Sequence, residues 1–131
     1  MPARKAAAQP HAKVRARIKV QLYLDAEIAF GPGKRELLEH ISSEGSISAA
    51  ARAMGLSYRR AWLMVDTMNR CFREALVSTG KGGPQRGGAE LTPFGRRVRD
   101  RYAALEATVA RSARRDLDYL RRQLRDGETR A

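Results

Sequence analysis

The side chains of this sequence that could do chemistry are mostly cationic. Lysine and arginine number 26 against 14 aspartates and glutamates, which gives the 131 residues a formal net charge of +12. A domain this basic repels itself unless a polyanion neutralises it, and nucleic acid is the commonest such partner. A ribosomal protein, or one that is merely basic, is the alternative. Composition therefore narrows the class of partner without naming the function.

The residue types that enzymes and metal sites use are sparse and scattered. Cys71 is the single cysteine, and His11 and His40 lie far apart without ligand spacing. No nucleophile–base pair or nucleotide loop is evident, so we expect no enzyme, no cofactor and no metal. One cysteine fits a reducing cytosol. The sequence shows no membrane-spanning run and no secretory leader, which predicts a cytoplasmic, nucleoid-associated protein without membrane contact.

Positive and hydrogen-bonding side chains gather where a helix is predicted to begin. Ser57 is placed to cap that helix, and Tyr58, Arg59 and Arg60 fill its first turn. Arginine there opposes the helix dipole, a local penalty that is easier to understand if the turn serves a polyanion. Trp62 is interpreted as a packing residue, with contact to a DNA backbone as the alternative. A solvated charged surface is the alternative for the whole face.

The segment before this helix predicts a helix–turn–helix. Ser46 or Ser48 can cap a short alanine-rich helix, and Gly55 supplies a left-handed turn. The second helix then runs from Ser57 to about Phe72, a length and pattern that match the unit whose second helix enters the DNA major groove. An ordinary helical hairpin also uses small residues and a turn glycine, so that alternative stays open.

A glycine-rich, cationic tip follows between two short extended segments. Residues 76–79 and 89–92 read as the strands of a β-hairpin, the usual shape of a wing. Lys81 and Arg86 in the tip can neutralise phosphates. A phosphate-binding P-loop would need GxxxxGK with Ser or Thr and then a helix, and this order is missing.

The remaining elements frame these motifs. Residues 19–25 alternate as a half-buried strand, with Val20, Leu22 and Leu24 on one side, and a helix should begin near Gly33 and end by Gly45. Apolar residues three or four apart then predict a helix from Thr92 for about thirty residues. Its distal apolar stripe needs a partner, which indicates a homodimer through this helix. Two helices with a break near residues 111–114 are the alternative.

Several joined motifs resemble the N-terminal DNA-binding domain of the ModE family of molybdate-responsive regulators, with LysR-type domains as more distant relatives. They are GSISAAA at 45–51, GLSYRRAW at 55–62, Met68-Asn69, GKGG at 80–83 and GGAELTPFG at 87–95. The resemblance covers roughly residues 19–109. In that family, Mop-type C-terminal domains bind the oxyanion, and we expect no such domain in this sequence. The resemblance therefore implies DNA binding, a dimer and transcriptional control, without support for a small-molecule effector.

The expected fold class is mainly α with a small β-wing: a winged helix-turn-helix plus a long C-terminal helix. The expected parts are a flexible basic arm at 1–17, the DNA-binding domain at 18–95, a dimerisation helix at 96–126 and a tail at 127–131. The basic arm reads as a disordered tail or as a source of additional phosphate contacts.

The expected function is that of a dimeric, sequence-specific transcription regulator that binds double-stranded DNA. The rivals are a non-specific nucleoid-associated protein and a DNA-binding subunit whose partner chain does the sensing. The residues that we expect to contact DNA are Ser46, Ser48, Ser57, Tyr58, Arg59, Arg60, Trp62, Leu63, Thr67, Lys81, Gln85 and Arg86.

Overall fold

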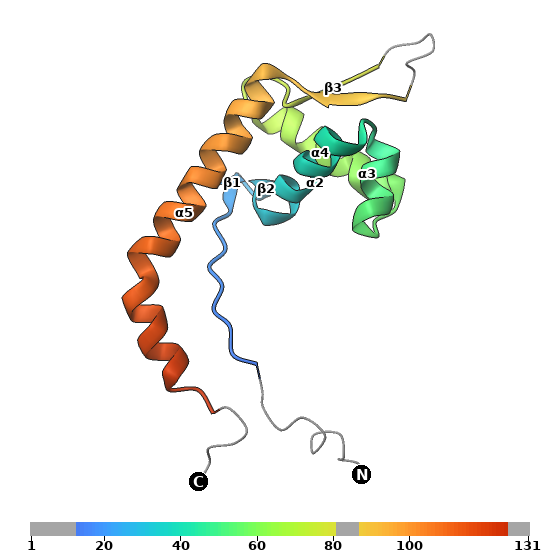
Figure 1. Ribbon diagram of the computed structural model, residues 1–131. Helices are drawn as coiled ribbons and strands as arrows, with labels where there is room; N and C mark the ends of the chain where they lie inside the picture. The colour runs from blue at the N-terminus through green and yellow to red at the C-terminus, as the bar shows by residue number, and fades with distance from the viewer. Residues whose placement is uncertain (1–12, 81–86, 126–131) are drawn as a thin grey trace, which may run out of the picture. The chain divides into compact units, whose positions relative to one another are not determined.

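The structure is a computed structural model, and it describes residues 13–80 and 87–125. Four helices and two small sheets follow one another along this part of the chain (Figure 1). The helices are α2 (Pro32–Glu44), α3 (Ile47–Met54), α4 (Tyr58–Cys71) and α5 (Pro93–Arg122); the strands are β1 (Leu22–Leu24), β2 (Glu27–Phe30), β3 (Val77–Thr79) and β4 (Ala89–Leu91). Backbone contacts divide the chain into two compact units. One is Lys19–Glu106, and the other joins the residues up to Ile18 with those from Ala107 onward.

The ends of α2, α3 and α4 are set by local chemistry. Pro32 opens α2, where a missing N–H has no consequence. Gly45 and Gly55 end α2 and α3 with φ of +83° and +70°, a left-handed backbone that glycine adopts without a Cβ clash. The Ser46 hydroxyl accepts from the Ala49 N–H at 3.0 Å and caps α3. These are the boundaries that the sequence predicts.

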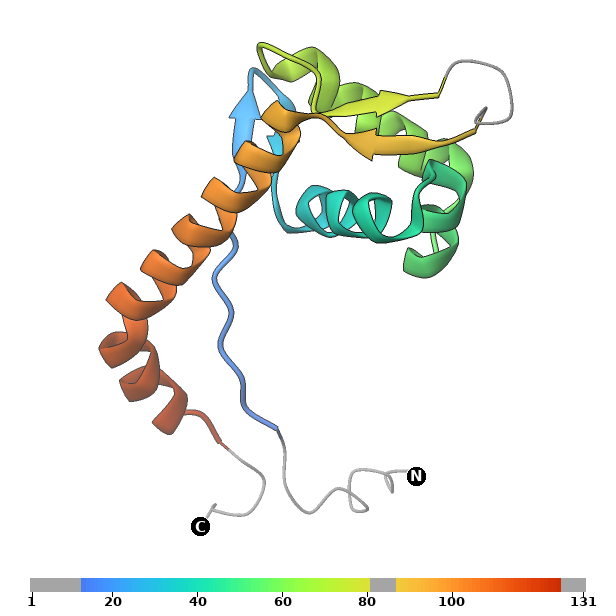
Figure 2. The same ribbon diagram turned by 45° about the horizontal axis from the view of Figure 1, so that its top comes forward.

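The core of the Lys19–Glu106 unit lies among α2, α3, α4 and the β3–β4 hairpin. Leu37, Leu38 and Ile41 of α2 have no exposed surface, and Ala61 and Met68 of α4 are equally buried. Figure 2 shows α2 running beside the β3–β4 hairpin. Phe30, Phe72, Phe94 and Tyr102 extend this core with edge-to-face ring contacts whose centroids lie 5.0–6.3 Å apart. The Tyr102 hydroxyl donates to the Val20 carbonyl at 2.7 Å.

The first turn of α5 is locked onto the residue that precedes β3. The Thr92 N–H donates to the Leu76 carbonyl at 2.9 Å, and the Thr92 hydroxyl donates to the Ala75 carbonyl at 2.7 Å. Gly95 lies so close to Leu76 that an added Cβ would overlap the Leu76 carbonyl oxygen. From the other side, the Asn69 side chain accepts from the Leu76 N–H at 2.8 Å and donates to the Val77 carbonyl at 3.1 Å. Three elements therefore meet at one residue.

The structure corrects the expected fold class and the first strand. There is not one small β-wing but two separate antiparallel hairpins, β1–β2 and β3–β4, among the residues described. Leu22 and Leu24, expected on a buried face, are 45% and 50% exposed. The strand is short because Asp25, with φ of +52°, turns the chain back so that Leu24 pairs with Glu27. Phe30, from the returning strand, fills the core instead.

Helix α5 is continuous from Pro93 to Arg122, which excludes the alternative of a break near residues 111–114. The expected domain boundaries, and the role of the 1–17 arm, stay predictions. No helix in the described ranges is long and apolar enough to cross a membrane.

We predict that Gly95→Ala destabilises the fold by about 1–3 kcal/mol, because the new methyl group overlaps a backbone carbonyl that cannot move without disturbing β3. The measurement is the free energy of unfolding in urea. Gly33→Ala is the matched control, since Gly33 also lies in the first turn of a helix but would meet only the Met64 methyl at 3.9 Å. The control should be neutral or stabilising by up to about 1 kcal/mol. Equal stability of the two variants would contradict the close contact between Gly95 and Leu76.

Candidate functional site

The first turn of α4 carries an exposed cationic surface. The Ser57 hydroxyl accepts from the Arg60 N–H at 3.1 Å, so this serine caps the helix as predicted. Tyr58, Arg59 and Arg60 are all exposed, and the turn contains no acidic residue. Among the residues that the structure describes, no carboxylate pairs with Arg59 or Arg60. Positive charge and the helix dipole therefore add together at this end of α4.

Exposed apolar side chains flank these arginines. Tyr58 is 56% exposed, Trp62 44% and Leu63 43%, although all three lie on a helix whose opposite side packs in the core. Trp62, interpreted from the sequence as a packing residue, is thus only partly covered. Large aromatic and aliphatic groups left in water beside free cations indicate a surface that something covers.

The structure adds Lys34 of α2 to the cationic surface, a residue that sequence reasoning missed. Burial lowers the pKa of Lys34; Cys71 and the Glu27 carboxylate oppose this, and repulsion by the Arg60 guanidinium adds a smaller lowering. Lys34 and Arg60 belong to different helices, so no local spacing could have linked them. We call Lys34, Arg59 and Arg60 the α4 cationic patch.

A separate ionic network holds the far end of α4. Arg70 donates to both carboxylate oxygens of Glu27 at 3.1–3.2 Å, and to Asp66 at 2.9 Å. The hydrogen bond from Arg70 holds the pKa of Glu27 below its usual range. Burial and the Glu27 carboxylate raise the pKa of Cys71, so its thiol is less reactive than a free one. This network joins β2 to α4, and its charged groups are paired with one another within the fold.

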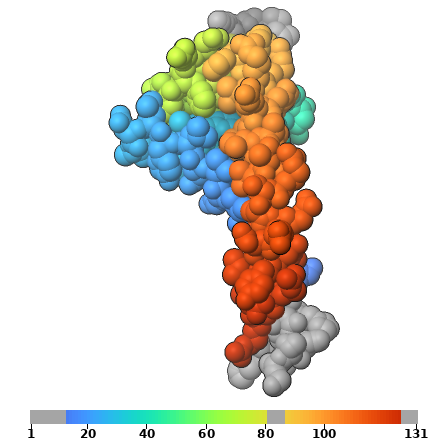
Figure 3. Space-filling view, turned by 90° about the vertical axis from the view of Figure 1, so that its left-hand side faces the viewer, coloured from blue at the N-terminus to red at the C-terminus, as the bar shows by residue number. Residues whose placement is uncertain are grey.

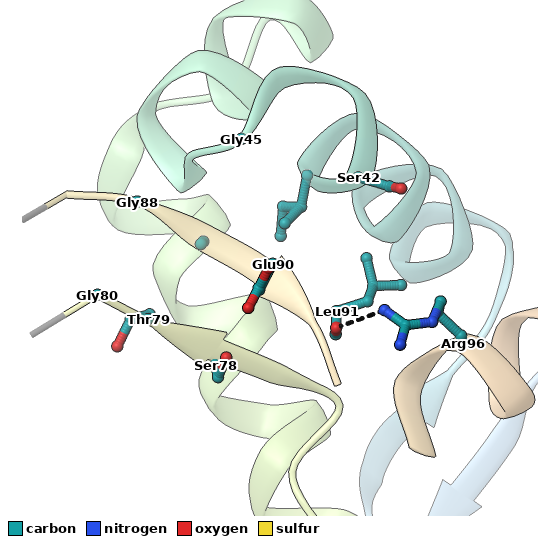
Figure 4. A pocket seen from close by; sticks show the side chains of 11 residues that line it. Ser42, Gly45, Ser78, Thr79, Gly80, Gly88, Glu90, Leu91 and Arg96 are labelled. Carbon is teal, nitrogen blue, oxygen red and sulfur yellow. Dashed lines mark hydrogen bonds between the residues drawn. The ribbon is translucent and has the colours of Figure 1, made fainter. Parts of the chain in front are cut away.

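A polar groove lies between α2 and the β3–β4 hairpin (Figure 4). Its volume is about 560 Å³, and the Ser42, Ser78 and Thr79 hydroxyls border it. Arg96 of α5 and Glu90 of β4 also line it, and Arg96 donates to the Leu91 carbonyl at 3.1 Å. The backbone beside the groove is held by a hydrogen bond: the Ala89 N–H, at the start of β4, donates to the Gly45 carbonyl, just after α2, at 2.8 Å.

The expected site residues fall into three groups. Ser57, Tyr58, Arg59, Arg60, Trp62 and Leu63 gather on or beside the first turns of α4, and Thr67 is half-buried further along it. Ser46 is occupied as the α3 cap, and Ser48 is half-buried on α3. Lys81, Gln85 and Arg86 lie outside the described residues. Whether any of them contacts a ligand stays a prediction. The described residues hold no cluster of side chains suited to a metal ion.

Comparison with known proteins places the chain beside proteins concerned with molybdenum. It is 44% identical over 88 residues to the molybdenum transport protein ModE of Azotobacter vinelandii and 46% identical over 81 residues to the molybdenum-pterin-binding protein MopB of Rhodobacter capsulatus. It is also 37% identical over 92 residues to the DNA-binding transcriptional dual regulator ModE of Escherichia coli K12. The chain is similar to ModE and Mop proteins. No family model matches it.

These matches cover part of each protein. They include 67%, 62% and 70% of this chain, but only 33%, 30% and 35% of the respective relatives. The chain thus spans about a third of the length of the relatives it matches. The activity of a whole relative therefore cannot be carried over as a finding.

The relatives' names correct the identification made from the sequence. We expected a resemblance to the N-terminal DNA-binding domain of the ModE family, LysR-like and without support for a small-molecule effector. The first two relatives are named for molybdenum transport and molybdenum-pterin binding. The identification as a DNA-binding domain alone does not stand.

The expected function is corrected in the same way. Of the three relatives, only the Escherichia coli protein is named for DNA binding and regulation. Sequence-specific transcription regulation is therefore withdrawn for this chain, together with the LysR-like and winged helix-turn-helix terms. Four helices with two small antiparallel sheets describe the fold of residues 13–80 and 87–125.

Proposed function

We propose that this chain is a polyanion-binding module that contacts double-stranded DNA through the α4 cationic patch, in a cytoplasmic protein linked to molybdenum. The observation that carries the proposal is the unpaired positive charge at the start of α4. Arg59 and Arg60 are exposed at a helix N-terminus that no carboxylate of the described residues neutralises. Backbone phosphates supply the missing negative charge, irrespective of base sequence.

The charge of the whole chain supports the same partner. At +12 the protein attracts a duplex over a distance set by ionic strength, and counterions released from the duplex favour binding. The exposed Tyr58, Trp62 and Leu63 then cover apolar sugar and base edges beside the phosphates. This role needs no catalytic group, and we do not propose an enzyme.

We predict that Arg59→Ala with Arg60→Ala weakens binding to every duplex. The slope of log Kobs against log salt should become shallower by about 0.9 for each phosphate that the variant no longer neutralises. The measurement is fluorescence anisotropy with a random-sequence duplex over a salt series. Arg73→Ala is the control, because Arg73 is exposed but lies beyond the far end of α4. Unchanged slopes in the double variant would rule out the patch as the DNA-binding surface.

A homodimer through α5 belongs to the same proposal. Leu105 and Leu120 on α5, and Leu124 just after it, are 39–57% exposed. They continue the apolar stripe that recurs at helical spacing along this helix. A second copy that lays the same stripe against them would remove this surface from water.

We predict that Leu120→Glu with Leu124→Glu shifts the chain from dimer to monomer in light scattering after size exclusion, because charges replace the buried contact. Ser112→Glu with Gln123→Glu adds the same charge at exposed polar positions and should leave the dimer intact. A wild-type monomer, at concentrations well above those of the binding assays, would contradict the proposed dimer.

Molybdate is a second candidate ligand, favoured by the names of two relatives. The groove between α2 and the β3–β4 hairpin offers the Ser42, Ser78 and Thr79 hydroxyls as donors and the Arg96 guanidinium as a positive charge. Glu90, on the same groove, opposes a dianion. The site is thus a hydrogen-bonding surface with one charge of each sign.

If molybdate binds there, sodium molybdate should release or absorb heat in calorimetry, whereas sodium sulfate, the control dianion, should give a weaker signal. Glu90→Gln should tighten binding because it removes a repulsive charge, and Arg96→Gln should weaken it. Absence of heat with the wild-type chain would eliminate this candidate and leave duplex binding untouched.

A further inference from the structure

The C-terminal half of α5 carries a second cationic surface that the proposed function does not use. Arg111, Arg114, Arg115 and Arg122 are exposed, and at about 100° per residue they fall within about 100° of one another around the helix. We call these four residues the arginine face. In Figure 3 the side chains of this half of α5, in dark orange and red, are in open view.

Most of the charge of the arginine face is not neutralised locally. Residues 107–125 contain six arginines and two aspartates, Asp116 and Asp118. Asp118 lies on the face, four residues after Arg114 and four before Arg122, but it pairs with Arg121 at 3.2 Å. In the described ranges no carboxylate pairs with Arg114, Arg115 or Arg122, and Arg111 contacts only the Thr108 hydroxyl at 3.4 Å. Arg111 and Arg115 are also at i and i+4, where like charges destabilise a helix.

The use of arginine in place of lysine on α5 favours a surface that binds phosphate over one that is only solvated. The last lysine of the chain is Lys81, so every cation of α5 is an arginine. Arginine presents a planar fork that binds phosphate through two parallel hydrogen bonds, whereas lysine is a point charge. A solvated helix face typically mixes lysine with glutamate at i and i+4. The arginine face contains no lysine and no glutamate, and Asp118 is the one acidic residue on it.

The spacing of the face fits a duplex. At about 1.5 Å per residue, Arg111 and Arg122 lie about 16 Å apart along the helix axis, a length over which duplex DNA presents about ten phosphate charges. A helix lying on a lipid surface would instead need a free apolar side. Val109, Ala113 and Leu117, on the side opposite the arginines, are half-buried, and the exposed Leu120 and Leu124 of that side are assigned to the proposed homodimer.

We propose that the arginine face of α5 is a second contact surface for the phosphates of double-stranded DNA, distinct from the α4 cationic patch. The inference rests on the proposed duplex binding. It assigns to the long helix a direct role in holding the polyanion besides self-association. Because phosphates carry no base identity, the contribution is the same for every sequence.

The test is the triple variant Arg114→Gln, Arg115→Gln and Arg122→Gln in the full chain. Glutamine preserves helix propensity, which circular dichroism verifies. The expected result is a salt slope shallower by about 0.9 per arginine that contacts a phosphate, thus by about 2–3 in all, with equal loss of affinity for unrelated duplexes.

The matched control lowers the net charge by the same amount away from the face. It is Gln21→Glu, Ser43→Glu and Gln123→Glu, three exposed positions off the arginine face. This variant should keep the wild-type slope. Equal salt slopes for the two triple variants would mean that the arginines act only through the net charge of the protein, which would overturn the inference.

Two further comparisons separate a failure of this inference from a failure of the proposed function, and DNA binding from lipid binding. If Arg59→Ala with Arg60→Ala weakens duplex binding and the arginine-face variant does not, this inference fails while the proposed function stands. If the wild-type chain binds no duplex, both fail. Flotation with phosphatidylcholine–phosphatidylserine vesicles tests lipid directly. Vesicle capture that depends on the three arginines, with an unchanged DNA slope, would make the face a lipid surface and overturn the proposal.

Discussion

The close approach of α5 to Leu76 is the constraint on which the other elements depend. Leu76 has no exposed surface, its N–H is held by Asn69 of α4, and its carbonyl receives the Thr92 N–H. Only a glycine at position 95 lets the helix backbone come this near. Because one backbone unit joins α4, β3 and α5, a shift in any of the three strains the other two. The start of α4, which carries the cationic patch, is held for the same reason: its buried stripe continues to this lock.

The charged side chains fall into two groups, those that hold the fold together and those left on the surface. The unit Lys19–Glu106 contains ion pairs with clear mechanical roles: Arg70 joins α4 to Glu27 of β2, and Arg35 of α2 lies 3.5 Å from Glu106 of α5. These carboxylates are engaged within the fold. The arginines at the start of α4 have no such partners in the described residues. A net charge of +12 is therefore not spread evenly: these acids hold elements together, and the excess cations remain on surfaces.

Most helix ends could be predicted from the sequence because they depend on neighbours. Ser46, Ser57, Gly45 and Gly55 act within a few residues of their own positions, so caps and left-handed turns are readable locally. The β1–β2 hairpin could not be predicted from the sequence, because it depends on Asp25 adopting a positive φ that few non-glycine residues take. The contribution of Lys34 also escaped prediction, since only folding brings it near Arg60. The identification from motifs went wrong at the function, because short motifs specify a local backbone shape and not what a whole protein binds.

The two ligand classes make different demands on this chain. Duplex DNA is a long array of charges, and scattered arginines on exposed helix faces suffice for it because each phosphate is neutralised separately. Molybdate is a small dianion whose binding requires several donors converging on one point, with no carboxylate near. Serine and threonine residues line the groove beside β4, but so does Glu90, whereas the start of α4 has arginines without a carboxylate partner among the residues described. The geometry of this part of the chain therefore fits an extended polyanion better than a compact one. A molybdenum ligand, if this chain binds one, has to overcome the charge of Glu90.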